Sequence, residues 1–329
     1  MKKRKIVIVG MGSIGRRHAN LLAERSDTDI AFCDPDQTML ERSRTEIGPY
    51  MAHSGFEQAL ASQPDIMILA TPHHLHVEQT LMALERDIHV LCEKPVSDTL
   101  ASAKRLAREA PNHTATVGIG FHFHFHKGLL RLKELITNGF LGQIIHISCR
   151  VGSFITLANS TSRYQASMQG ALLLDYAHQP DLIYWLQNQI PQRVYVSASL
   201  AGDMEFFSDP NILDMSLEFQ GLFRSTIHLN YLQMPERHEY EIVGDKGWAL
   251  LDANTGQLKL GNLYENTINI EHIMLDRDQM YRDEHQAFFD AIDGNRAVET
   301  SPQDGLISMA IIDAAMRSWK SRKPATLES

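Results

Sequence analysis

The sequence predicts a two-domain fold: a doubly wound parallel α/β domain, then an α+β domain with a large, mostly antiparallel open sheet. The chain has 329 residues, and domains of about 100–200 residues argue for two of them. The first third alternates short apolar runs with segments of helical length, as βαβ units do. After about residue 120 the runs lengthen and alternate like antiparallel strands. We expect one domain over residues 1–120 and a second over 121–329, whose last helices could pack back on the first.

The composition excludes several classes of protein. Hydrophobic residues make up 43% and charged residues 22% of the chain, as in ordinary globular proteins. The formal net charge is -9, which argues against a nucleic-acid partner. No apolar run reaches the ~18 residues of a membrane span. The cysteines at 33, 92 and 149 form no C-x-x-C pair, so we expect reduced thiols in a cytoplasmic protein that binds no membrane.

Five parallel strands are predicted in the first domain. Each is a short apolar run rich in β-branched residues, and apolar residues at helical spacing follow most of them. Pro72 ends the third run, because proline disfavours helix at the residue before it. The predicted strands cover residues 6–9, 30–33, 66–70, 89–92 and 115–118, and the predicted helices cover 14–24, 77–85 and 99–109.

The second domain is predicted as one sheet interrupted by a helix. A first helix over residues 129–137 ends before Gly139 and Gly142. A sheet face left without helices would be a natural surface for a homodimer or homotetramer. The predicted strands cover residues 144–151, 193–199, 215–219, 224–232, 240–243 and 248–252, and the predicted helices cover 172–186, 281–293 and 303–321.

A glycine-rich turn joins the first predicted strand to the first predicted helix. It reads GMGSIG, and in this context it is the fingerprint of a Rossmann dinucleotide-binding domain. Gly10 permits the tight turn, Gly12 lets the backbone approach a pyrophosphate, and Gly15 lets helix and strand pack closely. The amides at the helix start, at Ser13 and Ile14, would face the phosphates.

An acidic residue, Asp34, closes the second predicted strand at about the expected 20-residue offset. Its carboxylate can accept hydrogen bonds from both adenosine ribose hydroxyls, and its charge would repel a 2′-phosphate. The sequence therefore favours NAD(H) over NADP(H). Arg16, Arg17, Arg42 and Arg44 could still accommodate that phosphate, or they could form solvated helix faces.

A Glu93-Lys94-Pro95 sequence follows the fourth predicted strand, at the sheet edge where open α/β folds bind ligands. Alone, it could be a turn with an ion pair. Together with the glycine turn and residues 71–76 (TPHHLH), it resembles the glucose-fructose oxidoreductase, inositol dehydrogenase and rhizopine-catabolism (Gfo/Idh/MocA) family. The resemblance continues at residues 170–186, 242–248 and 284–292, and so spans nearly the whole chain.

This resemblance implies an NAD(H)-dependent oxidoreductase with cofactor contacts and a catalytic set. The implied catalytic residues are Lys94, His178 and Asp175, although Asp175 precedes His178 by three residues where much of the family has four. That spacing is similar to a subgroup associated with surface-sugar metabolism. His124 stands where the family often has an arginine. The implied cofactor contacts outside the glycine turn and Asp34 are Thr71, Pro72, His74, His76, Glu93 and Lys94.

The residue types fit this chemistry. Oxidation of a secondary alcohol needs hydride transfer to nicotinamide and loss of the hydroxyl proton. The Lys94 ammonium would hold the reacting oxygen, with Glu93 as its orienting partner, and His178 would exchange the proton. On a helix, Asp175 would project to the same face as His178. The alternative for His178 is a helix residue packed between domains.

Histidines alternate with phenylalanines over Phe121–His126, which predicts a strand with three histidines on one face. A metal site of His122, His124 and His126 is one interpretation. Neighbours on one strand face rarely converge on a single ion, so we expect no metal and assign His122 and His124 to a substrate pocket. Tyr164 could reach substrate hydroxyls or face solvent, and the bond before Pro95 could be cis.

The leading hypothesis is an NAD(H)-dependent oxidoreductase. It would transfer a hydride between nicotinamide and a secondary hydroxyl or ketone of a sugar, sugar derivative or cyclitol. One alternative is an enzyme that retains NAD and cleaves glycosides or epimerises by transient oxidation. Another is a non-catalytic, dinucleotide-responsive regulator. The presence of Lys94 and His178 argues against it, because a sensor needs no pair of residues that exchanges a proton.

Overall fold

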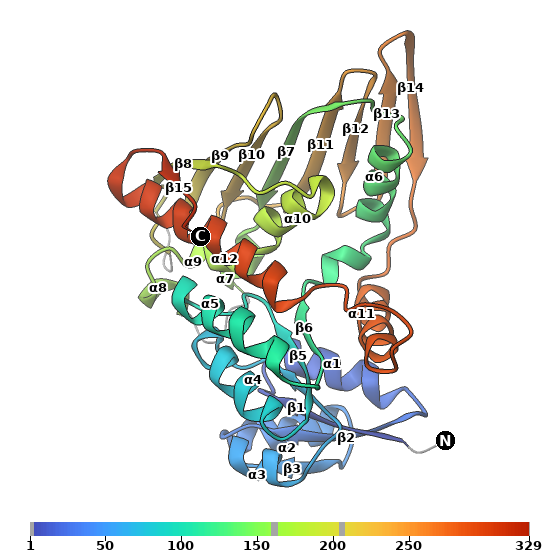
Figure 1. The fold of residues 1–329 in the computed structure, drawn as a ribbon, viewed down its shortest axis with the longest axis vertical. Helices are drawn as coiled ribbons and strands as arrows, with labels where there is room; N and C mark the ends of the chain where they lie inside the picture. Colours follow the sequence, from blue (N-terminus) through green and yellow to red (C-terminus); the bar gives the residue numbers. More distant parts are fainter. Residues whose placement is uncertain (1–2, 159–163, 204–207, 329) are drawn as a thin grey trace. The chain divides into compact units, whose positions relative to one another are not determined.

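The chain forms two compact units, each with its own β-sheet (Figure 1). A computed structural model describes residues 3–158, 164–203 and 208–328. The first unit contains Met1–His122 and Arg277–Met309, and the second contains Phe123–Asp276 and Ala310–Ser329. A C-terminal segment therefore belongs with the N-terminal unit.

A parallel sheet forms the centre of the first unit. Its strands are β1 (Arg4–Val9), β2 (Thr28–Cys33), β3 (Met51–His53), β4 (Ile66–Leu69), β5 (His89–Glu93) and β6 (Val117–Gly120). In the described part of the chain they lie in the order β3-β2-β1-β4-β5-β6, with every pair parallel. This is the Rossmann strand order, so the predicted fold class of this unit is confirmed. All four residues of β4 are buried, as expected for a strand covered on both faces.

Helices follow the strands of this sheet. They are α1 (Ser13–Ala23), α2 (Gln37–Glu46), α3 (Phe56–Ala61), α4 (His76–Leu84) and α5 (Leu100–Glu109), with short 3₁₀ turns η1 (His73–Leu75), η2 (Ala110–Asn112) and η3 (His122–Phe125). Side chains start two of them: Asp36 accepts from the Thr38 amide at 2.8 Å, and Thr99 accepts from the Ser102 amide at 3.3 Å. The elements α2, β3 and α3 were not predicted from the sequence. Only Leu40 and Ser43 of α2 are buried, so its apolar periodicity is weak.

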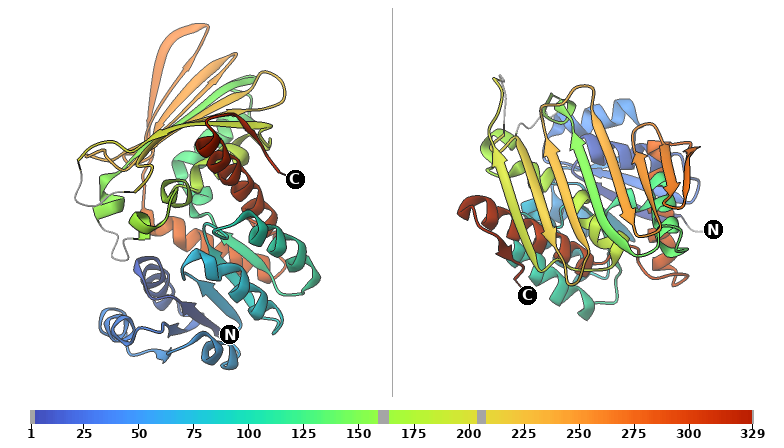
Figure 2. Two further views of the ribbon diagram at one scale, coloured as in Figure 1. Left: turned by 90° about the vertical axis from the view of Figure 1, so that its left-hand side faces the viewer. Right: turned by 90° about the horizontal axis from the view of Figure 1, so that it is seen from above.

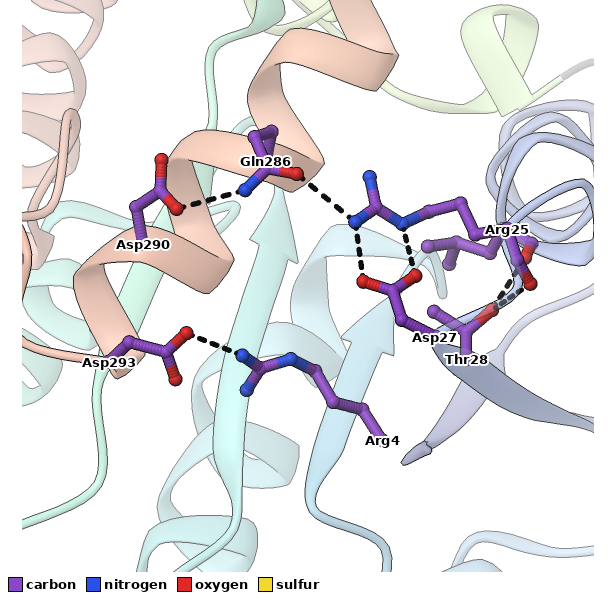
Figure 3. Close-up of polar contacts among 8 residues, drawn as sticks. Arg4, Arg25, Asp27, Thr28, Gln286, Asp290 and Asp293 are labelled. Carbon is purple, nitrogen blue, oxygen red and sulfur yellow. Dashed lines mark hydrogen bonds and ion pairs between the residues drawn. The ribbon is translucent and has the colours of Figure 1, made fainter. Parts of the chain in front are cut away.

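The helix α11 (Arg277–Ile292) packs on the first sheet although it comes from the far end of the chain. Phe288 and Phe289 join the core formed by β1 and β2. Figure 3 shows the polar contacts beside it: Arg4 pairs with Asp293 at 2.6 Å, and Arg25 donates to the Gln286 side chain at 3.1 Å. Apolar burial therefore holds α11 in this unit, and the partly exposed ion pairs add little to it.

The second unit is built on a larger, mixed sheet. Its strands are β7 (Ile144–Gly152), β8 (Arg193–Ser199), β9 (Ile212–Glu218), β10 (Arg224–Asn230), β11 (Arg237–Gly244), β12 (Gly247–Asp252), β13 (Gln257–Asn262), β14 (Glu265–His272) and β15 (Ala325–Thr326). Within the described ranges the order is β14-β13-β12-β11-β7-β10-β9-β8-β15. β10 pairs with β7 in parallel and the other pairs are antiparallel, which confirms the mostly antiparallel prediction.

Helices cover one face of this second sheet (Figure 2). They include α6 (Lys127–Thr137), α7 (Phe154–Ala158), α8 (Tyr164–Ser167), α9 (Ala171–Asp175), α10 (His178–Gln187) and the C-terminal part of α12 (Pro302–Ser321). In β8, Val194 and Val196 are buried whereas Arg193 and Tyr195 are exposed. The two-residue period of such strands predicted this sheet.

Two local predictions after residue 120 were wrong. Phe121–His126 is not an alternating strand, because His122–Phe125 forms the 3₁₀ turn η3. The helix predicted over 172–186 is two helices, since α9 ends at Asp175 and α10 begins at His178. Pro180 explains the break: it has no amide hydrogen, and in a continuous helix its ring would clash with the carbonyl of residue 176. Tyr176 has ψ 34° instead.

Among the described residues, no helix combines the length and apolarity needed to cross a bilayer.

Close packing at the first turn generates a stability prediction. A Cβ added to Gly15 would lie 1.8 Å from the Gly10 carbonyl oxygen, whereas one added to Gly12 meets no atom within 4 Å. Gly15→Ala should therefore lower the free energy of unfolding by about 1–3 kcal/mol. Gly12→Ala, the matched control, should change it by less than about 0.5 kcal/mol. Urea unfolding followed by circular dichroism measures both, and equal midpoints would contradict this packing.

Candidate active site

The glycine turn after β1 packs closely against the neighbouring backbone. Gly10 has φ 89°, and a Cβ there would lie 2.5 Å from the Ala70 carbonyl oxygen, so only glycine fits. Gly12 precedes the first turn of α1 and has no side chain to cap it. The first amides of α1, from Ser13 and Ile14 onward, are thus left to bind an anion from outside the helix.

The carboxylate of Asp34 lies beside this turn at the end of β2. One oxygen accepts from the Met11 amide at 2.7 Å and the other from the Asp36 amide at 2.9 Å. These bonds fix the carboxylate at the position where a Rossmann domain binds adenosine ribose.

Three of the four arginines that could attract a 2′-phosphate, Arg16, Arg17 and Arg42, pair with acids. Arg16 lies 3.2 Å and Arg42 2.7 Å from Glu46, and Arg17 lies 3.1 Å from Asp278. The guanidinium of Arg16 also donates to the Met11 carbonyl at 2.8 Å.

The segment after β4 is tied to the turn after β5. His76 is buried, and its two ring nitrogens lie 2.8 Å from the Thr71 carbonyl oxygen and 2.9 Å from that of Pro95. Burial lowers the pKa of His76, so the ring is neutral and donates one of these bonds. His74 and Pro72 are exposed. His76 therefore links two loops, while His74 and Pro72 are open to a ligand.

Glu93 is a buried carboxylate at the end of β5. Its Oε1 lies 2.9 Å from His18 Nε2, and its Oε2 accepts from the Lys94 amide at 3.2 Å. Burial alone would raise the pKa of Glu93, but the hydrogen bond from His18 and the nearby charge of Lys94 lower it below its usual value. Glu93 therefore accepts a hydrogen bond from the backbone of Lys94. The Lys94–Pro95 bond is cis.

Sequence reasoning missed a buried group around Glu93. His285 Nε2 lies 2.7 Å from His18 Nδ1, and the Tyr281 ring stacks on His122 with centroids 4.4 Å apart. Burial lowers the pKa of His122 to about 3. The sequence could have indicated His18, because it lies three residues after Gly15 on the buried face of α1. Nothing in the local sequence of α11 indicates that this helix packs beside Glu93.

In the second unit, His178 begins α10 and is buried, with its ring edge against Phe123 at a centroid distance of 4.6 Å. Asp175 ends α9, and its carboxylate accepts from the Tyr231 hydroxyl and, at 3.1 Å, from Gln165. Burial and the charge of Asp175 raise the pKa of Tyr231 well above its ordinary value, so the hydroxyl keeps its proton. Because the helix breaks between them, Asp175 and His178 do not share one helical face, contrary to the prediction.

The other predicted histidines of this region have structural partners. His124 is buried, with Nε2 2.8 Å from Asp181, and its ring lies against Trp185 at 4.6 Å. His126 caps α6 by accepting from the Gly128 and Leu129 amides, and its Nε2 lies 3.1 Å from the Ala253 carbonyl oxygen. The break from strand to 3₁₀ turn thus gives the three histidines separate surroundings. Tyr164 begins α8 and is partly buried.

Comparison with known proteins matches an N-terminal and a C-terminal part of the chain. The description "Oxidoreductase family, NAD-binding Rossmann fold" matches residues 4–121, and "Oxidoreductase family, C-terminal alpha/beta domain" matches residues 133–327. The chain belongs to the Gfo/Idh/MocA oxidoreductase family. This membership confirms the predicted class of enzyme, an NAD(P)-dependent dehydrogenase or reductase that acts on CH–OH groups.

Several characterised relatives have similar sequences or folds. Inositol 2-dehydrogenase of Salmonella paratyphi B is 25% identical over 342 residues, which is 98% of this chain and 96% of that protein. The rhizopine catabolism protein MocA of Rhizobium meliloti is 29% identical over 201 residues, 60% of this chain and 62% of that protein. The crystal structure of scyllo-inositol dehydrogenase from Lactobacillus casei, with bound NAD(H) and scyllo-inositol, superposes with a TM-score of 0.85 at 21% identity over all of both chains.

The buried acid Glu284 generates a prediction about stability and pH. Both its carboxyl oxygens lack a hydrogen-bond partner among the described residues. Burial and the charge of Glu93 raise its pKa well above the ordinary value. A carboxyl whose pKa is raised on folding costs stability increasingly as pH rises above its unfolded pKa of about 4.3. The free energy of unfolding of Glu284→Gln should therefore rise relative to that of the wild type. The difference should grow by up to about 1.4 kcal/mol for each pH unit above the unfolded pKa.

Urea unfolding of both proteins from pH 5 to pH 8 measures this difference. The exposed Glu41→Gln on α2 is the matched control, and it should show a difference that does not change with pH. A pH-independent difference for Glu284→Gln would show that this carboxyl is ionised in the folded protein.

Proposed function

We propose that the protein is an NAD(H)-dependent dehydrogenase. It transfers a hydride between nicotinamide and a secondary hydroxyl or ketone of a sugar, sugar derivative or cyclitol. The observation that carries the proposal lies within the first unit: Lys94 follows β5 and the glycine turn follows β1, so both stand at the carboxyl edge of one parallel sheet. Two relatives, named for inositol and rhizopine, support the substrate class.

The residues at this edge fit NAD(H). Gly12 leaves open space where a Cβ would stand, and the amides of Ser13 and Ile14 can receive the pyrophosphate. The Asp34 carboxylate suits two ribose hydroxyls and repels a 2′-phosphate, so NAD(H) is preferred over NADP(H). When bound, the nicotinamide supplies or accepts the hydride. Further proposed contacts are Thr71, Pro72, His74, His76 and Glu93.

The chain's own residues then handle the proton and the developing charge. The Lys94 ammonium donates a hydrogen bond to the reacting oxygen and stabilises negative charge on it. Glu93, ionised and buried, holds the Lys94 backbone through its amide. His178 exchanges the hydroxyl proton. Asp175 assists as a positioning residue, because its bonds to Tyr231 and Gln165 fix the segment that leads to His178.

We also propose a substrate pocket, an assembly and a location. His122, His124 and Tyr164 remain the proposed substrate-side residues. The face of the second sheet that displays Arg193 and Tyr195 is the proposed surface for a homodimer or homotetramer. Because the three cysteines are buried free thiols, a reducing, cytoplasmic location is proposed.

The role of Lys94 generates the central prediction. Lys94→Met should lower kcat by about 10²- to 10⁴-fold, because the reacting oxygen loses its positive partner. NAD affinity should change by less than about threefold, since the glycine turn and Asp34 are intact. NADH formation over a panel of sugars, inositols and sugar acids measures turnover, and calorimetry measures binding. Lys5→Met, an exposed lysine of β1, is the matched control.

Two outcomes would favour the alternatives. If no substrate is turned over faster than by Lys94→Met while NAD still binds, the regulator gains support. NAD that stays bound through purification, without net turnover of added NAD, would favour glycoside cleavage or epimerisation.

Asp34 generates a prediction about cofactor choice. Asp34→Asn removes the charge that repels a 2′-phosphate and weakens two ribose hydrogen bonds. The ratio of the NADP Kd to the NAD Kd should fall by about tenfold or more. Asp29→Asn, an exposed acid on the same strand, should leave the ratio unchanged. Titration of both cofactors by calorimetry measures it, and an unaltered ratio in Asp34→Asn would assign the selectivity to other residues.

A further inference from the structure

Four buried side chains meet beneath Lys94 within the first unit. They are His18 of α1, Glu93 of β5, and Glu284 and His285 of α11, each at most 6% exposed. His285 Nε2 lies 2.7 Å from His18 Nδ1, His18 Nε2 lies 2.9 Å from Glu93 Oε1, and Glu93 Oε2 accepts from the Lys94 amide at 3.2 Å. A continuous hydrogen-bonded chain thus runs from α11 to the residue proposed to hold the reacting oxygen.

The hydrogen-bond donors on each group determine which atoms donate and which accept. An ionised carboxylate only accepts, so His18 Nε2 donates to Glu93. His285 Nε2 and His18 Nδ1 share the second hydrogen bond, in which one nitrogen donates and the other accepts. Burial and the charge of Arg25 lower the pKa of His285 well below its ordinary value, which keeps His285 neutral. The bond between His18 and Glu93 therefore runs from the imidazole donor to the carboxylate acceptor.

The carboxylate of Glu93 has little freedom to move. A Cβ added to Gly120 would lie 3.1 Å from both Cδ and Oε1 of Glu93, so the carboxylate passes directly over the backbone of β6. Titratable or charged groups among the described residues also face this cluster. They are Arg17 of α1, Arg25 just after α1, Lys94, His122, and Arg277, Tyr281 and Glu284 of α11. The backbone of β6 and the bond from His18 therefore together limit where the Glu93 carboxylate can lie.

The same groups could be arranged as a metal site, because ligand atoms of His18, Glu93 and Glu284 lie within 4.8 Å of one another. The distances favour the hydrogen-bonded chain. Both nitrogens of His18 are engaged at 2.7 and 2.9 Å, which are hydrogen-bond lengths. A metal ion would have to replace the bond between His18 and Glu93. The experiment below therefore also measures metal content.

We propose that His18 and His285 are positioning residues for Lys94: the chain His285–His18–Glu93 holds the Glu93 carboxylate against the Lys94 amide and so fixes the turn that presents the ammonium. This inference rests on the proposed function of Lys94. Neither histidine touches substrate or cofactor. They act through Glu93 alone.

Two amide substitutions separate the two bonds of His18. The amide nitrogen of Gln takes the place of His Nε2, so His18→Gln keeps the donor to Glu93. The Asn side chain reaches only the place of Nδ1, so His18→Asn loses that donor. We expect kcat to fall by about 10- to 100-fold in His18→Asn and by less than about threefold in His18→Gln, with the KM for NAD unchanged in both. Gly120→Ala, which displaces Glu93 directly, should resemble His18→Asn.

A second readout does not depend on turnover. Reductive ¹³C-methylation followed by NMR reports the titration of lysines, and comparison with Lys94→Met assigns the signal of Lys94. When Glu93 is displaced, the ammonium loses a nearby negative charge, so Lys94 should titrate at lower pH in His18→Asn, by about half a pH unit or more. His18→Gln should restore the wild-type titration. Circular dichroism and NAD binding identify any variant that fails to fold.

The outcomes distinguish this inference from the function on which it rests. If Lys94→Met keeps full activity, the proposed function fails, and the lysine titration still decides the positioning role. If Lys94→Met is inactive while folded His18→Asn keeps the wild-type kcat and Lys94 titration, positioning by His18 is wrong. One equivalent of zinc per wild-type chain, absent from His18→Asn by mass spectrometry, would replace the hydrogen-bonded chain with a metal centre.

Discussion

The parallel order of the first sheet determines where its chemistry can occur. β1 has β2 on one side and β4 on the other, and β5 lies next to β4. Parallel strands end at a common edge, so the glycine turn, Asp34, Thr71 and Lys94 share that edge although they are up to 84 residues apart. Each strand therefore needs to contribute only one or two functional residues, placed directly after its last buried position.

A buried charge at this edge constrains the packing below it. Glu93 is ionised at 6% exposure, and such a carboxylate is tolerated only when hydrogen bonds replace its water. His18 and the Lys94 amide supply those bonds. Glu284 lies close to it, and two neighbouring buried carboxyls cannot both ionise at low cost, so Glu284 keeps its proton. Such local exceptions to apolar packing are typical of functional sites.

Much of this arrangement could be predicted from the sequence, because it depends on local patterns. The buried run at 66–69, the glycine turn and Glu93-Lys94 each carry their meaning within a few residues. The rest depends on contacts between distant segments. Nothing near residue 285 indicates that His285 meets His18, since their 267-residue separation is closed only by the packing of α11. Weakly patterned elements such as α2 and β3 were missed because few of their residues are buried.

Pro180 shows how one residue can change what a spacing means. Counted along a continuous helix, Asp175 and His178 would share a face, and the carboxylate would orient the imidazole. Pro180 prevents that helix, so α9 ends at Asp175 and the carboxylate turns to Tyr231, just after β10. The new start at His178 also puts Asp181 in the first turn of α10, where the helix dipole favours its charge and His124 meets it at 2.8 Å. Because of the break, Asp175 and His178 do not form a pair within one helix. Instead, the bond of Asp175 to Tyr231 and that of Asp181 to His124 fix the chain on the two sides of His178.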